Sequence, residues 1–215
     1  MRIRPVSVAA GVAAVALFLS GPANADIITN GNFQTGTLAG WTVFTTSNGS
    51  NGAGLPNVVS FNTTGGGASD AAHFNVGEAT FDGLPRGGGL SQTIVAPVSG
   101  SYTLTEDFAS MATAANEDAG TFSIIIDGTS VATDSLGFIS NDQTLRGNFD
   151  ETVNLTAGSH TFETEITRVF QNSSNTPDQF LDNISLSAAT PEPASLLLLG
   201  TGLMALAGRW RRRNS

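Results

Sequence analysis

The sequence predicts an all-β domain, a sandwich of two antiparallel sheets, between two hydrophobic terminal segments. The central region is rich in Gly, Ser, Thr, Asn and Asp, and its Val, Ile, Thr and Phe residues alternate with polar residues over short stretches. No long 3.6-residue periodicity interrupts this pattern before the C-terminal segment. About eight short strands in one region of this size favour two packed antiparallel sheets.

The first half of the central region has the weaker strand pattern. Glycine-rich stretches at 48–54, 65–69 and 83–89 are expected to be loops, and the last precedes a strand over 90–95.

Trp41 has two interpretations, a platform for stacking a sugar ring or a core residue. Its apolar neighbours favour the core.

The second half has clearer strands, in which alternate residues form apolar sets. The turn Asp127-Gly128 is typical of a hairpin and joins two of these strands. The sets expected to face the core are, in chain order, Tyr102, Leu104 and Phe108; Phe122, Ile124 and Ile126; Val153 and Leu155; His160, Phe162 and Ile166; and Phe180, Asp182, Ile184 and Leu186.

The N-terminus has the three parts of a secretory signal peptide. Two arginines precede an apolar run from 6 to 19, and Ala23-Asn24-Ala25 supplies the small-residue cleavage pattern. The alternative is a membrane-spanning helix, but a span needs about 20 apolar residues. We therefore expect a signal helix within residues 1–25, which signal peptidase removes.

The C-terminus is a second three-part signal. Pro191-Glu192-Pro193 is followed by an apolar segment at 194–208 and by four arginines within 209–213. A helix of this length rises about 22 Å, against about 30 Å of hydrocarbon core. This marginal span favours a transient hold in the inner membrane, with the arginines on the cytoplasmic side. A permanent tail anchor is the alternative.

The segment 190–215 resembles the PEP-CTERM sorting signals of Gram-negative bacteria. This resemblance rests on the Pro-Glu-Pro motif, the short hydrophobic helix with internal glycines, and the Arg-rich end. It implies recognition by an exosortase and cleavage near Pro191, Glu192 and Pro193. It also implies a destination at the cell surface or in an extracellular polysaccharide matrix.

The domain between the two signals, residues 26–189, is strongly acidic. Of the 18 acidic residues only Glu192 lies outside it, and it contains three arginines and no lysine, which gives 3 − 17 = −14. This charge disfavours nucleic acid and anionic membrane surfaces as partners. Because the chain has no cysteine, thiol catalysis and cysteine-ligated zinc are excluded.

Short motifs near both ends of the domain resemble the galactose-binding-like jelly roll of many carbohydrate-binding modules. The resemblance implies a structural calcium ion held by a carboxylate near the start and an aspartate on the last strand. Here Gln34 replaces the carboxylate and Asp182 matches the aspartate. The motifs are Asn30-Gly31-Asn32-Phe33-Gln34, Gly40-Trp41, Leu90-Ser91-Gln92-Thr93, Gly100-Ser101-Tyr102-Thr103-Leu104 and Phe180-Leu181-Asp182-Asn183-Ile184-Ser185-Leu186.

The phase of Asp182 gives a separate argument for a special role. Because it lies in phase with Phe180, Ile184 and Leu186, we expect its carboxylate to face the core. An unpaired buried carboxylate costs several kcal/mol, so it needs a cation, an arginine or backbone N–H groups. Calcium ligation and capping of the first strand therefore both remain candidates.

The sequence offers no convincing catalytic site. Glu163 and Glu165 fall on one strand face about 7 Å apart, which is more typical of a soluble surface than of a glycosidase pair. His73 and His160 are the only histidines, and neither belongs to a nucleophile or zinc motif. Both are expected to be packed or to lie at the rim.

Three hypotheses about function follow from these observations. The first is a non-catalytic exported module that binds extracellular polysaccharide weakly, through residues that the sequence does not identify. The second is a purely structural, glycosylated matrix protein. The third is a carbohydrate-active hydrolase with an unrecognised site.

Overall fold

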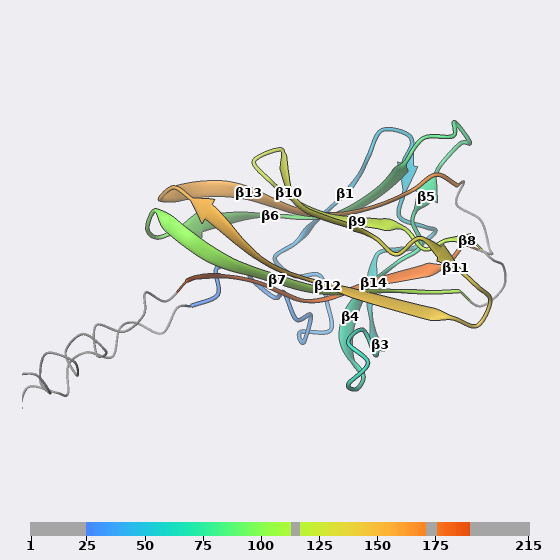
Figure 1. Cartoon of the computed structure of the whole chain (residues 1–215), viewed down its shortest axis with the longest axis horizontal. Helices are drawn as coiled ribbons and strands as arrows, with labels where there is room; N and C mark the ends of the chain where they lie inside the picture. The colour runs from blue at the N-terminus through green and yellow to red at the C-terminus, as the bar shows by residue number, and fades with distance from the viewer. Residues whose placement is uncertain (1–24, 113–116, 171–175, 190–215) are drawn as a thin grey trace, which may run out of the picture. The chain divides into compact units, whose positions relative to one another are not determined.

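Every regular element that the structure describes is a β-strand. The computed structural model describes residues 25–112, 117–170 and 176–189. Its strands form two five-stranded antiparallel sheets that lie over one another (Figure 1). The predicted all-β sandwich is therefore confirmed. The expected terminal helices, Ala23 and the motif at 191–193 lie outside the described residues, and Ala25 is the first described residue.

The strands alternate between the two sheets along much of the chain, as in a jelly roll. In the described residues, two short pairs of strands complete the fold: β2 (Gly49–Ser50) with β5 (Gly77–Glu78), and β8 (Glu117–Asp118) with β11 (Phe138–Ile139). The first sheet contains, in spatial order, β1 (Thr42–Thr45), β6 (Arg86–Ala96), β13 (Gly158–Arg168), β9 (Thr121–Ile126) and β10 (Thr129–Ser135). The second contains β12 (Thr144–Leu155), β7 (Gly100–Met111), β14 (Asp178–Ala188), β4 (Ser69–Phe74) and β3 (Asn57–Phe61).

The core lies between the two sheets and contains most of the predicted apolar sets. Tyr102, Leu104 and Phe108 of β7 pack in the same cluster as Phe122 and Ile124 of β9. Each such side chain stabilises the fold by roughly 1.5–3 kcal/mol when fully buried. The Asp127-Gly128 hairpin is also confirmed, with φ of 51° and 75°, the left-handed values that a type I′ turn requires.

Part of the glycine-rich stretch 83–89 is a strand and not a loop. Residues from Arg86 onward belong to β6, and Gly89 lies in register between Phe44 of β1 and Glu165 of β13. A Cβ atom at Gly89 would lie 1.9 Å from the Thr164 carbonyl oxygen. The glycines in this strand therefore reflect close backbone packing, which their composition alone could not distinguish from a loop.

The predicted phase of the last strand is wrong at its centre. A β-bulge shifts the register of β14 between Asp182 and Ser185, and Asn183 has a φ of 52°. Leu181 and Ile184 consequently face the main core, whereas Phe180 packs in a separate apolar cluster. The bulge inverts the alternation, so Asp182 does not share a face with Ile184.

Candidate functional site

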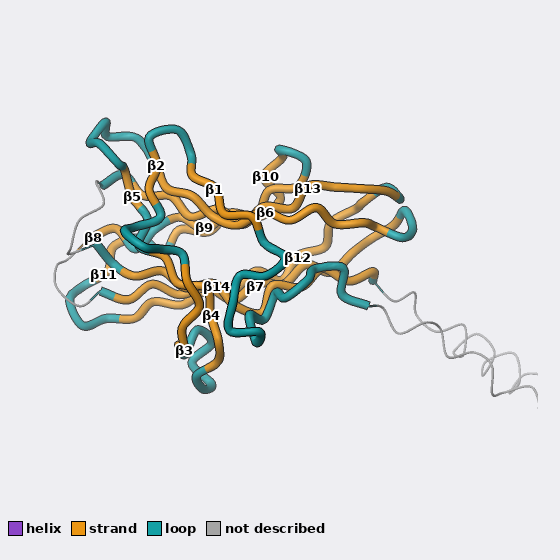
Figure 2. Tube along the Cα trace, turned by 180° about the vertical axis from the view of Figure 1, so that it is seen from behind, coloured by secondary structure: helices purple, strands orange, loops and turns teal. Residues whose placement is uncertain are grey.

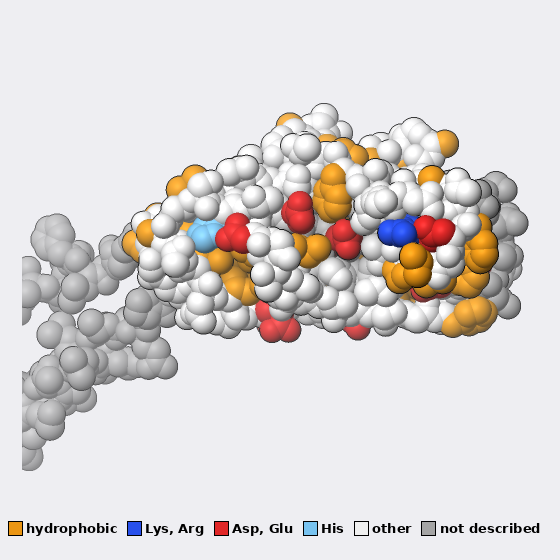
Figure 3. Space-filling model, turned by 90° about the horizontal axis from the view of Figure 1, so that it is seen from above, with side chains coloured by type: hydrophobic (Ala, Val, Ile, Leu, Met, Phe, Trp, Pro, Cys, Tyr) orange, Lys and Arg blue, Asp and Glu red, His pale blue; other side chains and the backbone are white. Residues whose placement is uncertain are grey.

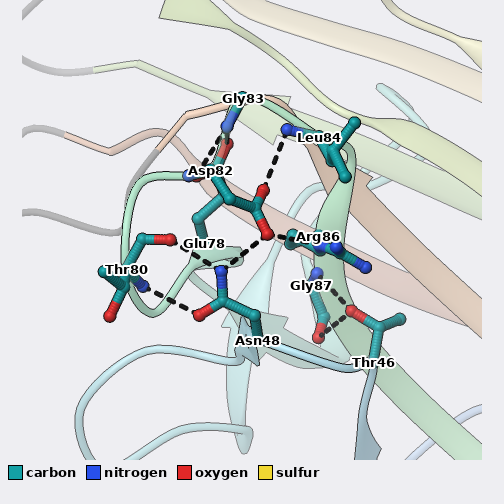
Figure 4. A network of polar contacts seen from close by, with 9 residues as sticks. All are labelled: Thr46, Asn48, Glu78, Thr80, Asp82, Gly83, Leu84, Arg86 and Gly87. Carbon is teal, nitrogen blue, oxygen red and sulfur yellow. Dashed lines mark hydrogen bonds and ion pairs between the residues drawn. The ribbon is translucent and has the colours of Figure 1, made fainter.

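The loop at 79–85, between β5 and β6, is held in one shape by side chains that surround it. Glu78 is fully buried, and its carboxylate accepts hydrogen bonds from the backbone N–H groups of Asp82 and Gly83. Figure 4 shows Glu78 inside the loop with these N–H groups directed at it. A carboxylate that is satisfied in this way costs little to bury and fixes the turn.

A second group of contacts holds the loop from outside (Figure 4). The Asn48 amide donates to the Thr80 carbonyl at 2.7 Å and to the Asp82 carboxylate at 2.9 Å, and it accepts from the Thr80 N–H at 3.1 Å. Asp82 also accepts from the Leu84 N–H and from Arg86 Nε, each at 3.0 Å. The hydrogen bond from Asn48 is the main reason that the pKa of Asp82 is lowered. Asp82 and Arg86 therefore form an ion pair beside the loop.

This fixed loop exposes large apolar side chains. Phe81 is 66% exposed and Leu84 is 51% exposed. Phe170, which is 48% exposed, follows β13, and its carbonyl accepts from the Glu78 N–H at 2.9 Å. Figure 3 views the molecule from above, and at one end of the face in view it shows apolar side chains gathered around a pair of opposite charges. Exposed apolar patches of this kind commonly mark binding sites.

We call this patch the distal surface and define it by Phe81, Asp82, Leu84, Arg86 and Phe170. It lies at the end of the sandwich that carries β5, β8 and β11, opposite the described chain ends (Figure 1). This surface was not predicted from the sequence, because glycine is the most prominent feature of the stretch 83–89. Two large apolar residues beside Asp82-Gly83 in a turn were the available signal.

A cleft of about 550 Å³ lies toward the other end, between the edge strands β10 and β12. His160 lies in it and is buried, as expected for a packed histidine. Its Nδ1 lies 2.7 Å from an Asp127 carboxylate oxygen, and its Nε2 lies 2.9 Å from the Thr156 carbonyl. Because both ring nitrogens have partners, His160 is poorly placed to act as a general base.

The contact between Asp127 and His160 is expected to shift the pKa of His160, which a titration can measure. The hydrogen bond to Asp127 raises the pKa of His160 above 6.5, and the same bond lowers the pKa of Asp127 below 3.8. The histidine contribution to stability is therefore complete below about pH 6.5 and is lost as pH rises through the higher folded pKa. In an NMR titration, Asp127→Asn should lower the pKa of His160. An unchanged value would show that Asp127 does not cause the shift.

Trp41, the candidate platform for a sugar ring, and Tyr102, expected to face the core, both belong to the core. Trp41 packs against Phe33 and Phe162, with both pairs of ring centroids 6.1 Å apart, and its Nε1 donates to the Asn30 carbonyl. Tyr102 is fully buried. The core interpretation of both is confirmed, and neither can serve as an exposed platform.

The remaining histidine and the two glutamates discussed in the sequence, His73, Glu163 and Glu165, are partly buried on strands of the sandwich. His73 lies 2.9 Å from the Asp178 carboxylate and stacks on Phe180. Glu163 and Glu165 lie half-buried on one face of β13, and partial burial, followed by the charge of Glu163, raises the pKa of Glu165. Both carboxylates extend from one face of β13, and neither lines the cleft that contains His160.

Gln34 and Asp182 differ in their surroundings. Gln34 is exposed and its amide donates to the Asn32 carbonyl. Asp182 is fully buried and accepts from Ser69 Oγ and from the Asn183 N–H. Burial is the main cause of its raised pKa. Among the described residues, no group of three or more His, Cys, Asp or Glu side chains is arranged to hold a metal ion. The calcium site stays a prediction, which a melting curve with and without a chelator tests.

The C-terminal resemblance is confirmed by comparison with known families. The model of the PEP-CTERM protein-sorting motif matches residues 189–213. The chain therefore carries a protein-sorting signal of exported proteins. No curated protein matches the chain. The described residues contain no helix long and apolar enough to cross a membrane.

Several solved structures are similar in shape at low sequence identity. A family 35 carbohydrate-binding module from Clostridium thermocellum is 18% identical, covers 71% of this chain and 95% of its own, and has a TM-score of 0.37. The CBM22-1 xylan-binding domain of Paenibacillus barcinonensis Xyn10C is 12% identical, covers 80% and 100%, and has a TM-score of 0.43. An arabinose-bound MgGH51 α-L-arabinofuranosidase is 15% identical with a TM-score of 0.47, and the match covers 76% of this chain and 26% of that enzyme.

Proposed function

We propose that this protein is a non-catalytic module that is exported, processed through its C-terminal sorting motif, and binds extracellular polysaccharide through the distal surface. Signal peptidase removes the N-terminal signal. An exosortase cleaves near the motif at 191–193 while the tail is held in the inner membrane. The mature domain then remains at the cell surface or in the extracellular matrix.

The observation that carries this proposal is a set of apolar side chains on a loop that is already fixed. Sugar rings have apolar C–H faces, and these pack against aromatic side chains such as Phe81 and Phe170. The contacts of Glu78 and Asn48 fix the loop before binding, so little conformational entropy is lost on association. Arg86 is partly exposed, and the guanidinium has N–H groups besides Nε that can donate to sugar hydroxyls.

The same geometry supports a binding role over a catalytic one. The two carboxylates at the loop, Glu78 and Asp82, both accept backbone N–H groups. Glu78 is also fully buried, so its carboxylate cannot reach a substrate. A canonical glycosidase needs two carboxyl groups that flank the scissile bond, one of which exchanges a proton with the substrate, and the buried Glu78 can fill neither role.

Removing the aromatic contact should weaken polysaccharide binding. We expect Phe81→Ala to reduce retention of the purified domain in affinity electrophoresis against the host's secreted polysaccharide by at least fivefold. Val43→Ala, on β1 and also exposed, is the matched control and should retain wild-type binding. Equal retention of the two variants would exclude the distal surface. A wild-type domain that is retained by no polysaccharide would exclude the proposed function.

A further inference from the structure

The two described chain ends leave the sandwich side by side. Asp26 pairs with Ser187, and the Ile27 N–H donates to the Leu186 carbonyl at 3.0 Å. The Asp26 carboxylate also accepts from the Leu186 N–H at 2.9 Å. The predicted start of the mature chain and the strand that leads to the sorting motif therefore share one end of the fold. Figure 2 shows the two described ends close together at this end of the sandwich.

The turn between β6 and β7 lies directly beside this exit. The Ala189 N–H donates to the Ser101 carbonyl at 2.8 Å, which joins the last described residue to the start of β7. The turn is fixed from both sides, because the Tyr102 hydroxyl donates to the Val98 carbonyl and the Ala157 N–H donates to Ser99 Oγ. We call residues 95–101 the proximal turn.

The proximal turn is apolar and free of charge in a strongly acidic domain. Val95 is 63% exposed and Val98 is 56% exposed. No charged residue occurs between 90 and 105. Of the carboxylates near this end, Asp127 is paired with His160, and Asp26 accepts hydrogen bonds from the Ile28 and Leu186 N–H groups. This end is consequently the part of the domain that an anionic bilayer would repel least.

The length of chain beyond the described strand limits how far this end can lie from the membrane. Four residues lie between Ala189 and Ala194, the first residue of the apolar segment, and the five steps from one Cα to the next span at most about 18 Å. The headgroup region occupies about 5–8 Å of that distance. While the tail is held in the bilayer, the proximal turn cannot move far from the headgroups.

We infer that the proximal turn is a membrane-contact surface, with Val95 and Val98 against the lipid headgroup region in the anchored intermediate. This inference rests on the transient membrane hold of the proposed function. A second copy of the domain is disfavoured as the occupant, because two domains of charge near −14 repel each other. Contact at this end directs the distal surface away from the membrane, toward extracellular polysaccharide.

The absence of cysteine allows a direct test with single labels. The full chain carrying Val98→Cys or Phe138→Cys is labelled with an environment-sensitive fluorophore and incorporated into vesicles that contain a lipid-linked quencher. Phe138, on β11 at the other end of the sandwich, is 67% exposed, somewhat more than Val98, and is the matched control. We expect the label at position 98 to be quenched at least twofold more than the label at 138. Val95→Cys supplies a second site if the label at 98 disturbs the turn.

Four outcomes test this inference and the proposed function. Equal quenching at 98, 95 and 138 in chain that sediments with the vesicles overturns the membrane contact and leaves polysaccharide binding in place. Stronger quenching at 98, with no retention on polysaccharide, supports the contact and overturns the binding function. Chain that does not sediment with vesicles overturns the membrane hold and the contact together. If the turn binds an added exosortase and the label at 98 shows no lipid quenching, the membrane contact is also overturned.

Discussion

Replacing Glu106 with glutamine is expected to raise the free energy of unfolding at pH 8 to 9 by several kcal/mol. Glu106 of β7 is buried in the centre of the sandwich, where Thr164 of β13 donates to one carboxylate oxygen at 3.0 Å. Its other oxygen, Oε2, has no hydrogen-bond partner among the described residues. Burial is the main cause that raises the pKa of Glu106 to about 8, and the charge of Asp107 adds to it.

The sign of this effect follows from the protons that each state binds. The unfolded chain releases the Glu106 proton near pH 4.5, whereas the folded chain keeps it until about pH 8. Stability therefore falls as pH rises across this interval. A shift from 4.5 to about 8 corresponds to about 5 kcal/mol at ~1.4 kcal/mol per unit, which is an upper limit. Glutamine cannot ionise, so the variant loses this penalty.

Urea unfolding of wild type and Glu106→Gln at pH 5 and pH 9 measures the difference. The wild type should lose several kcal/mol between the two pH values beyond the change in the variant. Glu151→Gln is the control, because Glu151 is exposed on β12. Parallel pH profiles for wild type and Glu106→Gln would show that Glu106 is already solvated or ionised in the folded state.

Alternation predicted the strand faces where the backbone is regular. Tyr102, Leu104 and Phe108 were correctly placed in the core because period 2 is a local property of β-strands. The same phase includes Glu106, so an inward carboxyl group was already implied by the sequence. Its partner Thr164 lies 58 residues away, and no local pattern identifies such a contact.

The errors arose where tertiary contacts determine the backbone. The bulge at Asn183 inverts the faces of β14, and Gly89 lies in a strand because β13 approaches it closely. The conformation of the candidate site also depends on tertiary contacts. Turn residues at 82–83 are visible in the sequence, but the loop is fixed by Asn48, which is 34 residues from Asp82. The binding surface therefore depends on the fold more than on any motif.

Removing the Glu78 carboxylate should abolish the fixed shape of the distal surface while the sandwich stays folded. Glu78→Ala leaves the N–H groups of Asp82 and Gly83 without their acceptor, at a cost of about 1–3 kcal/mol for each group that stays buried. The loop would relieve this cost by opening to water. Phe81 would then have to be ordered on binding, so we expect polysaccharide affinity to fall about tenfold or more.

Hydrogen exchange and polysaccharide affinity, measured on the same variants, distinguish the effect of the loop's fixed shape from the effect of the apolar contact of Phe81. In Glu78→Ala, the amides of Asp82 and Gly83 should exchange faster and binding should weaken. In Phe81→Ala, exchange should stay slow while binding weakens, because only the apolar contact is removed. Glu106→Gln should change stability with no effect on either quantity. If exchange is faster in Glu78→Ala but affinity equals that of the wild type, the fixed loop does not contribute to binding. The role of the distal surface would then rest on Phe81 and Phe170 alone.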